Sequence, residues 1–580
     1  MTVRRLSSLC QVSAVSTAVS SSPPHSRFKQ YVGRAVSSLL KLPPHTTEYT
    51  MHHGLRVPMR DGVDLIADHY KPATTNPLGT VLVRGPYGRG WPFSMLFARV
   101  YAARGHHVVV QSVRGTFGSG GEFAPMAHEI ADGADTAAWL RDQPWFTGSF
   151  ATIGPSYLGF TQWALLTDPP PEMKAAVIIV GPHDLSAPRW GTGSFGLNDF
   201  LGWSDMVARQ EEPRFRALVR QLRSRKALAA ATSALPVGEA GRALLGTGAP
   251  WYEAWLEHPE HDDPHWAPMQ LHQALERTQI PVLLLGGWQD LFLEQTLVQY
   301  QRLRERGVPV TVTIGPWTHT QVMTKGAPTV IRESLGWLDA HLAGTRSVAR
   351  KPVRIHVNGH GWRDLPAWPP AMPGRALFLQ PSGRLGDTEP GADTPASSFT
   401  YYPADPTPTV GGRLLSPEGG YRNDTRLAQR ADVLTFTGAP LPADLYVVGT
   451  PLLQLSHSCD NRYNDLFVRL SQVDERGRSR NVSDGYLCAT PDSRNVRIEM
   501  DAIAHRFPAG SRVRVLIAGG SHPRFARNLG TGEPLISGRR LASATHTVHL
   551  GEGGTSRLVL PAGPRPPSTD EAAHALGDLL

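Results

Sequence analysis

The sequence predicts an α/β protein with a mostly parallel sheet and a helical insert, followed by a separate β-sandwich. Short runs of Val, Ile and Leu alternate with helical stretches from residue 80 to residue 343, which is typical of a parallel sheet covered on both faces. The alternation is interrupted over residues 182–278, which are rich in Arg, Ala, Leu and Trp. After Lys351, short alternating stretches between Gly and Pro turns replace the helical periodicity.

The composition is that of a globular protein with more than one domain. A chain of 580 residues exceeds one compact core, and its 41% hydrophobic and 19% charged residues exclude a disordered or fibrous class. The net charge of +8 is concentrated before Glu48, where six basic and no acidic residues occur, so we expect no nucleic-acid partner. Cys10, Cys459 and Cys488 form neither a disulfide framework nor a metal site, and we expect no cofactor.

Residues 1–47 form a basic N-terminal extension. Met1–Ser22 is Ser-rich with two early arginines, but its middle is too polar for the apolar region of a signal peptide. We therefore expect a cytoplasmic protein, with secretion as the alternative. Phe28–Leu40 has apolar residues at helical spacing, which favours a helix packed on the body over a basic membrane-surface helix. No apolar run reaches the ~18 residues that a membrane-spanning helix requires.

The α/β core is expected over residues 48–181 and 279–350. A strand-rich entry from Glu48 contains a turn at Arg60-Asp61-Gly62. The strands predicted after it are Thr80–Val83, His107–Gln111, Ser149–Ile153, Val177–Val180, Val282–Leu285 and Val310–Ile314. The helices predicted between and after them are Phe93–Arg104, Ile130–Arg141, Leu158–Thr167 and Ser334–Ala343.

The two remaining parts of the chain differ in their sequence patterns. Residues 182–278, with a helical stretch over Glu212–Ala230, are expected to form a helical cap above the active edge of the sheet. Residues 351–580 are expected to form a β-sandwich of the jelly-roll type, because short strands recur at regular spacing. Those strands include the stretches VRIHVNG, ALFLQPSG, ADLYVVG, SRVRVLIAG and SRLVL.

The segment SFATIGPSYLGFTQWALL carries the strongest chemical signal. A strand ends at Ile153, a tight turn follows, and a helix begins at once. In α/β-hydrolases this context holds a nucleophilic serine with its hydroxyl exposed, which favours Ser156 as a nucleophile over a structural turn residue. The G-x-S-x-G pattern is not met, because Leu158 stands where the second glycine is expected and Gly159 follows it.

A serine nucleophile needs a base, and the base needs an orienting acid. In α/β-hydrolases these follow in the order Ser, Asp, His, each after a strand. The strand IPVLLL leads to Asp290, and the strand VPVTVTIG leads to His319. Both residues follow a strand's carboxyl end, where α/β sheets place their ligand crevice. We therefore predict Asp290 as the orienting acid, with a helix N-cap as its alternative role, and His319 as the base.

Acyl transfer also requires hydrogen-bond donors for the oxyanion. The backbone N–H of Tyr157, directly after the nucleophile, is one expected donor. The loop VRGPYGRG brings Tyr87 toward the site, either as a second donor or as a packing aromatic.

The chain contains several long and specific motifs, namely RGPYGRG, QSVRGTFGSGGEF, DGADTAAWLRDQPW, GPSYLGFTQW, GGWQDLF, IGPWTHT and PAGSRVRVLIAGGSHPRF. These motifs resemble those of the cocaine-esterase-like (CocE/NonD) hydrolases, which are related to X-Pro dipeptidyl peptidases and α-amino-acid ester hydrolases. The resemblance covers Glu48 to Leu560. It implies an α/β-hydrolase core with a C-terminal jelly roll, and it assigns the Tyr87 hydroxyl to the oxyanion hole beside the Tyr157 amide.

The resembling enzymes act on esters, on Xaa-Pro peptides and on β-lactam side chains. X-Pro dipeptidyl peptidases carry a large N-terminal domain, for which 47 residues are too few. The amino-acid ester hydrolases hold the substrate ammonium with carboxylates two and three places after the triad aspartate, where Phe292 and Leu293 stand here. We therefore expect a serine esterase for small-molecule substrates with apolar or aromatic acyl groups.

Three alternatives stay open. The cap acids Asp184, Asp199 and Asp205 keep a dipeptidyl peptidase possible. The resemblance also leaves a β-lactam or amide acylase open. A non-catalytic binding protein built on the jelly roll is a remote third.

The acyl pocket is expected to be aromatic and free of carboxylates. Phe292 should face the same crevice as Ser156, two residues beyond Asp290. Trp190 and Trp203 are expected to close the crevice from above, with packing inside the cap as their alternative role.

Overall fold

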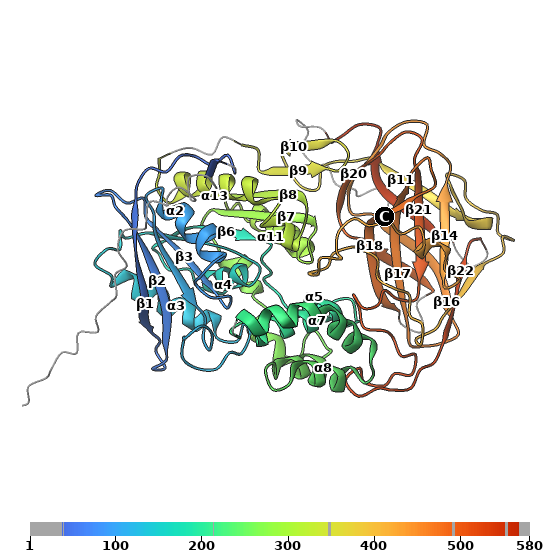
Figure 1. Cartoon of the computed structure of the whole chain (residues 1–580). Coiled ribbons are helices and arrows are strands. Elements are labelled where there is room, and N and C mark those ends of the chain that lie inside the picture. Colours follow the sequence, from blue (N-terminus) through green and yellow to red (C-terminus); the bar gives the residue numbers. More distant parts are fainter. Residues whose placement is uncertain are drawn as a thin grey trace, which may run out of the picture.

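The computed structural model describes residues 37–38, 40–212, 214–345, 350–489, 494–551 and 555–567. The helix predicted over Phe28–Leu40 lies largely outside these residues. Within them, no helix combines the length and apolarity needed to cross a bilayer. Figure 1 shows the α/β part and the β-sandwich side by side, with helices of the cap along one edge between them.

The α/β part contains a ten-stranded sheet in the order β1-β2-β4-β3-β5-β6-β7-β8-β9-β10. The strands β3 to β9 are parallel, whereas β1, β2 and β10 are antiparallel additions. The strands are β1 (Tyr49–Pro58), β2 (Asp64–Pro72), β3 (Thr80–Gly85), β4 (His107–Ser112), β5 (Phe150–Pro155), β6 (Met173–Ile179), β7 (Val282–Gln289), β8 (Val310–Thr318), β9 (Val353–Val357) and β10 (Gly361–Leu365).

Burial follows the difference between central and edge strands. Every residue of β3, β4, β5 and β7 is buried, because helices cover both faces of the parallel sheet. The edge strand β1 keeps most of its residues partly or fully exposed. The helices of this part are η1 (Met95–Arg99), α2 (Val100–Ala102), α3 (Glu129–Arg141), α4 (Tyr157–Leu166), α11 (Leu293–Glu305), α12 (His319–Val322) and α13 (Ala327–His341).

The prediction that the stretch VRIHVNG belongs to the β-sandwich is wrong. This stretch contains β9, which pairs in parallel with β8, and β10 pairs with β9. The first sheet therefore extends beyond residue 350 to Leu365. An alternating strand has the same pattern in either sheet, so its local sequence does not specify which edge it joins.

The cap is inserted between β6 and β7. Backbone hydrogen bonds join its two ends, from Leu271 N–H to the His183 carbonyl (2.7 Å) and from Leu185 N–H to the Met269 carbonyl (3.0 Å). The insert therefore leaves and re-enters the core at one place. Its helices are α5 (Ala187–Trp190), α6 (Leu197–Ala208), α7 (Arg214–Ser233), α8 (Val237–Leu245), α9 (Trp251–Glu257), η2 (Pro264–Met269) and α10 (His272–Arg277).

The β-sandwich has its own apolar core, with members such as Leu453, Phe436 and Ile517. An α/β-hydrolase core followed by a β-sandwich is the predicted fold class, and it is confirmed. The sandwich contains short helices η3 (Pro381–Gly383) and η4 (Leu427–Gln429) and strands β11 (Gly374–Gln380), β12 (Arg384–Gly386), β13 (Ser397–Tyr401), β14 (Val433–Gly438), β15 (Leu445–Gly449), β16 (Leu452–Cys459), β17 (Asn464–Val473), β18 (Ser479–Ala489), β19 (Asn495–Glu499), β20 (Ile503–Phe507), β21 (Arg512–Ala518), β22 (Ala544–His549) and β23 (Arg557–Gly563).

The strand order reverses beside β3, because the chain runs from β3 to β4 on one side and returns to β5 on the other. At such a switch point the loops after the two central strands diverge and leave a crevice. The loop after β3 carries Tyr87, and the turn after β5 carries Ser156. The topology therefore brings these two predicted site residues to one crevice.

Helix α4 leaves β5 at close range to the end of β6. A Cβ added to Gly159 would lie 2.5 Å from the Gly181 Cα, a contact that real Cβ atoms do not make. Gly336 in α13 is a control position for Gly159, because it is also a helical glycine but a Cβ added to it would meet nothing within 4 Å.

We expect Gly159→Ala to destabilise the fold by ~1–3 kcal/mol, since backbone would have to shift. Gly336→Ala should stabilise it by ~0.5–1 kcal/mol, since alanine loses less backbone entropy on folding. Urea unfolding of both variants checks this. Equal effects in the two variants would contradict the close approach of α4.

Candidate active site

Ser156 stands on a strained turn between β5 and α4. Its backbone angles are φ 58° and ψ −122°, a conformation that L-residues rarely adopt. The Ser156 N–H donates to the Ile179 carbonyl at 2.9 Å, and helix α4 begins at the next residue. The predicted strand–turn–helix geometry is thus present, and it projects the hydroxyl away from the sheet into a pocket.

The structure explains why leucine replaces the usual glycine at position 158. Cβ atoms built on Gly85 and Gly154 would lie 2.3 Å and 2.4 Å from the side chain of Leu158. Leu158 therefore occupies the space that these two glycines leave open. The close helix–strand approach is made one residue later, by Gly159.

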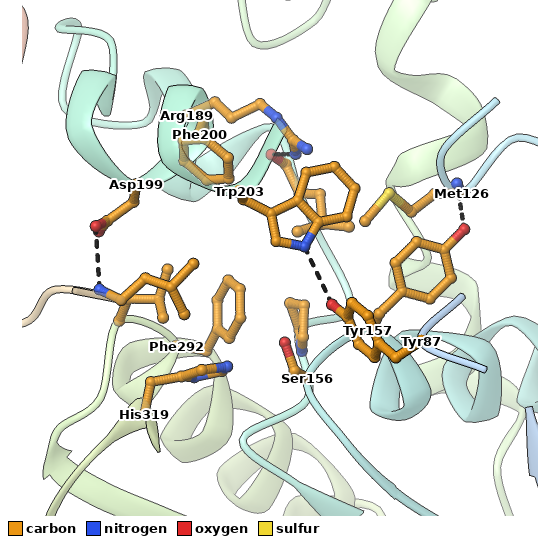
Figure 2. A pocket seen from close by; sticks show the side chains of 14 residues that line it. Tyr87, Met126, Ser156, Tyr157, Arg189, Asp199, Phe200, Trp203, Phe292 and His319 are labelled. Carbon is orange, nitrogen blue, oxygen red and sulfur yellow. Dashed lines mark hydrogen bonds between the residues drawn. The ribbon is translucent and has the colours of Figure 1, made fainter. Parts of the chain in front are cut away.

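His319 and Asp290 form a buried pair. The His319 Nδ1 and an Asp290 carboxylate oxygen are 2.6 Å apart. Asp290 is fully buried, and its other oxygen accepts the Phe292 N–H at 3.1 Å. His319 begins α12 behind a Thr318 capping box, so its backbone is fixed. The imidazole is turned toward Ser156 at the floor of the same pocket (Figure 2).

Two donors face the predicted oxyanion position. The Tyr157 N–H is the first of helix α4, and first-turn N–H groups have no acceptor inside a helix. The Tyr87 hydroxyl accepts the Trp203 indole N–H at 3.1 Å, and Tyr87 lines the same pocket as Ser156. Burial raises the pKa of Tyr87 to about 12, so its hydroxyl remains protonated and able to donate.

The ring of Tyr157 is fixed from below by a buried polar chain. Its hydroxyl donates to Glu129 at 2.9 Å and accepts the Met126 N–H at 2.8 Å. The Glu129 carboxylate lies 3.1 Å from the Arg84 guanidinium, and both side chains are buried. Sequence reasoning did not identify these residues, because their spacing along the chain gives no sign that they meet.

Fourteen residues from three parts of the chain line the pocket at Ser156, which has a volume of about 30 Å³ (Figure 2). A second cavity of about 760 Å³ shares Asp199, Phe200 and Leu291 with it and extends between cap, core and β-sandwich. The lining residues of the smaller pocket are Tyr87, Met126, Ser156, Tyr157, Pro182, Leu185, Arg189, Asp199, Phe200, Trp203, Leu291, Phe292, His319 and Leu415.

Two of the three predicted acyl-pocket residues lie in this lining. Phe292 packs its ring against His319 at a centroid distance of 5.4 Å, and Trp203 packs over Tyr157 at 6.4 Å. The prediction for Trp190 is wrong. Its indole N–H donates to the Trp255 carbonyl at 2.8 Å, and its ring packs on Phe195 inside the cap. Neighbouring residues of a helix point about 100° apart, so Arg189 faces the pocket instead.

The expectation of a pocket without carboxylates is also wrong. Asp199 lines the pocket and is 7% exposed. One of its oxygens accepts the Leu415 N–H and the Asn198 side-chain amide, each at 3.0 Å. Leu415 belongs to a β-sandwich loop that reaches the active site, a contact with no signal in the local sequence. Burial raises the pKa of Asp199 to about 6.

A nucleophile elbow, an Asp–His pair and two oxyanion donors at the switch point of a parallel sheet define a serine hydrolase of the α/β-hydrolase class. Comparison with known proteins supports this class. Residues 61–321 match the X-Pro dipeptidyl-peptidase (S15 family) model. Residues 347–559 match the model of the C-terminal non-catalytic domain of X-Pro dipeptidyl-peptidase.

The chain is similar to the cocaine esterase of Rhodococcus sp. (strain MB1 Bresler), with 30% identity over 88% of this chain and 98% of the relative. It therefore belongs to the cocaine-esterase-like hydrolases and is a serine ester hydrolase. Two solved structures share the fold at 22% identity and a TM-score of 0.76. The match to an aminopeptidase from a marine sediment Thaumarchaeota archaeon covers 90% of this chain and 97% of the aminopeptidase chain. The match to an α-amino acid ester hydrolase covers 90% of this chain and 98% of the hydrolase chain.

We expect Tyr87→Phe to lower kcat by ~10² to 10³-fold with little change in KM, since the hydroxyl would donate only to the transition-state oxyanion. Steady-state kinetics on a p-nitrophenyl ester measures both constants. Tyr402→Phe, at a site that is 57% exposed, controls for the conservative change itself. An unaltered kcat in Tyr87→Phe would make Tyr87 a packing aromatic.

Proposed function

We propose that the chain hydrolyses carboxylic esters through an acyl-enzyme on Ser156, with His319 as base and Asp290 as its orienting acid. The observation that carries the assignment is the 2.6 Å contact between His319 and the fully buried Asp290, in the pocket where Ser156 stands on its strained turn. The Tyr87 hydroxyl and the Tyr157 N–H complete the site as oxyanion donors.

The chemistry follows from these positions. Asp290 accepts the Nδ1–H of His319, which leaves Nε2 free to take the Ser156 proton as Oγ attacks the ester carbonyl. The negative charge that develops on the carbonyl oxygen is stabilised by the Tyr157 N–H and the Tyr87 O–H. His319 then donates the proton to the leaving alcohol. Water, activated by the same imidazole, releases the acid and restores Ser156.

We expect Ser156→Ala and His319→Ala each to lower kcat by on the order of 10⁶, and the double variant to lose little more, because the members act as one unit. A panel of p-nitrophenyl esters set against Xaa-Pro p-nitroanilides measures the loss for both substrate classes. A fluorophosphonate probe should label wild type but not Ser156→Ala. Clearly additive losses, or labelling at another residue, would overturn the assignment.

The lining of the pocket supports an apolar or aromatic acyl group. Phe292, Trp203 and Leu415 present apolar surface, and burying such surface contributes about 25 cal/mol per Å². The Rhodococcus relative is itself named an esterase. Phe292 and Trp203 are therefore proposed as acyl-binding residues, and no metal or cofactor takes part in the proposed mechanism.

Asp199 favours a second candidate, an enzyme for α-amino acyl groups or Xaa-Pro peptides. A buried carboxylate in the pocket could hold a substrate ammonium, and the S15 family model is named for dipeptidyl peptidases. Against this, Asp199 already accepts two hydrogen bonds, and the positions after Asp290 carry Phe292 and Leu293. We therefore keep the neutral acyl group as the main proposal.

Paired substrates separate the two candidates. We expect phenylacetate methyl ester to be cleaved about 10-fold or more faster than phenylglycine methyl ester, since an ammonium without a partner is costly to bury. The reverse preference would assign the amino-acyl function. Asp199→Asn should then abolish that preference. It should also vanish as the pH falls through about 6, where the carboxyl group takes up a proton.

We also propose a cytoplasmic location, supported by the polar middle of Met1–Ser22. Cys459 and Cys488 are free thiols, as expected in a reducing compartment. Cell fractionation with N-terminal sequencing tests this. A shortened product in the culture medium would contradict it.

A further inference from the structure

The pocket at Ser156 contains a buried cation that the proposed mechanism does not use. Arg189 lies on the cap side of the pocket, opposite Ser156 and His319 (Figure 2). It is only 1% exposed. A buried charge is costly unless it is paired, so the arrangement calls for an explanation.

Arg189 has few polar partners among the described residues. One Nη donates to the Leu185 carbonyl, and the buried Nε has no hydrogen-bond acceptor. Its remaining contacts are with aromatic rings. The guanidinium carbon lies 3.8 Å from the Trp255 ring centroid and 4.4 Å from that of Phe200. Burial lowers the pKa of Arg189 to about 9, so it remains a cation at neutral pH.

The nearby carboxylates have other partners. Asp184 accepts hydrogen bonds from the Ser186 hydroxyl and N–H through one oxygen, and His261 and His272 lie 3.2 Å and 3.3 Å from the other. Asp199 is engaged by Leu415 and Asn198. Neither forms an ion pair with Arg189 in the described part of the chain.

The contrast with Arg84 shows what a structural arginine looks like in this fold. Arg84 is also buried, but its guanidinium lies 3.1 Å from the Glu129 carboxylate and donates to Gln111 at 2.7 Å. Arg189 lacks such a carboxylate and lines the pocket in which the acyl group is proposed to bind.

We propose that Arg189 binds a carboxylate at the far end of the acyl group, so that the enzyme prefers half-esters of dicarboxylic acids. This inference rests on the proposed ester hydrolysis at Ser156. The apolar side chains take the body of the acyl group, and the guanidinium takes its free acid end. A guanidinium matches a carboxylate with parallel hydrogen bonds, and the interaction is strong where water is excluded.

The test compares phenyl half-esters of the dicarboxylic acids from succinic to suberic with the matching neutral carboxamides. Each pair has the same length and shape, and Ser156→Ala measures the uncatalysed background. We expect wild type to favour the carboxylate member of its best pair about 10- to 100-fold in kcat/KM, as for a hydrogen-bonded charge pair. In Arg189→Met the ratio of the two kcat/KM values should fall to about 1, and in Arg189→Lys it should lie between that value and the wild-type value.

Arg209→Met is the matched control. Arg209 is another cap arginine, but it pairs with Asp205 at 3.0 Å and lies outside the pocket lining. The preference for the carboxylate should be unchanged in this variant. If Arg189 only stabilises the cap through its aromatic contacts, Arg189→Met lowers the thermal stability. It then also lowers kcat/KM for the carboxylate and for the matching carboxamide by the same factor, which would overturn the inference.

Wild type alone also decides the question, should Arg189→Met fail to fold. Cleavage of carboxamides at least as fast as carboxylates at every chain length would overturn the inference and leave the esterase proposal intact. A wild type that cleaves no ester at all would instead overturn the proposed function.

Discussion

The backbone turn at Ser156 is the constraint on which the rest of the site depends. Its positive φ is held by the packing of β5, α4 and the end of β6, and that packing needs bare backbone at Gly159 and Gly181. Leu158 packs over Gly85 and Gly154 and so links the turn to β3, and the loop after β3 carries Tyr87. The proposed nucleophile and the proposed oxyanion donor are thus set by the same few van der Waals contacts.

The pocket around that turn is assembled by parts of the chain that are distant in sequence. The cap supplies Trp203, whose indole N–H fixes the Tyr87 hydroxyl. The β-sandwich supplies Leu415, whose N–H fixes the Asp199 carboxylate. The first contact joins the cap to the α/β core and the second joins the β-sandwich to the cap, so the shape of the pocket depends on how three bodies dock.

Buried charges divide into two kinds in this molecule. Arg84 with Glu129, and Arg469 with Asp484 at 2.6 Å in the β-sandwich, are paired and satisfied, as structural ions in a low dielectric must be. Arg189 is the exception in the pocket itself, stabilised by ring faces and one carbonyl. An unpaired charge in a desolvated site raises the free energy of the ligand-free protein, and a ligand of opposite charge lowers it again.

The sequence by itself determined the α/β core, the strand–turn–helix at Ser156 and the placement of Asp290 and His319 after strands. These features are local, because periodicity, turn residues and strand ends are all encoded within a few positions. Tertiary structure decided that Arg189 rather than Trp190 faces the pocket, that Asp199 and Leu415 reach it, and that β9 joins the first sheet. Each of these depends on which face of an element, or which distant loop, packs against the core, and that choice is made by long-range burial, which local sequence does not encode.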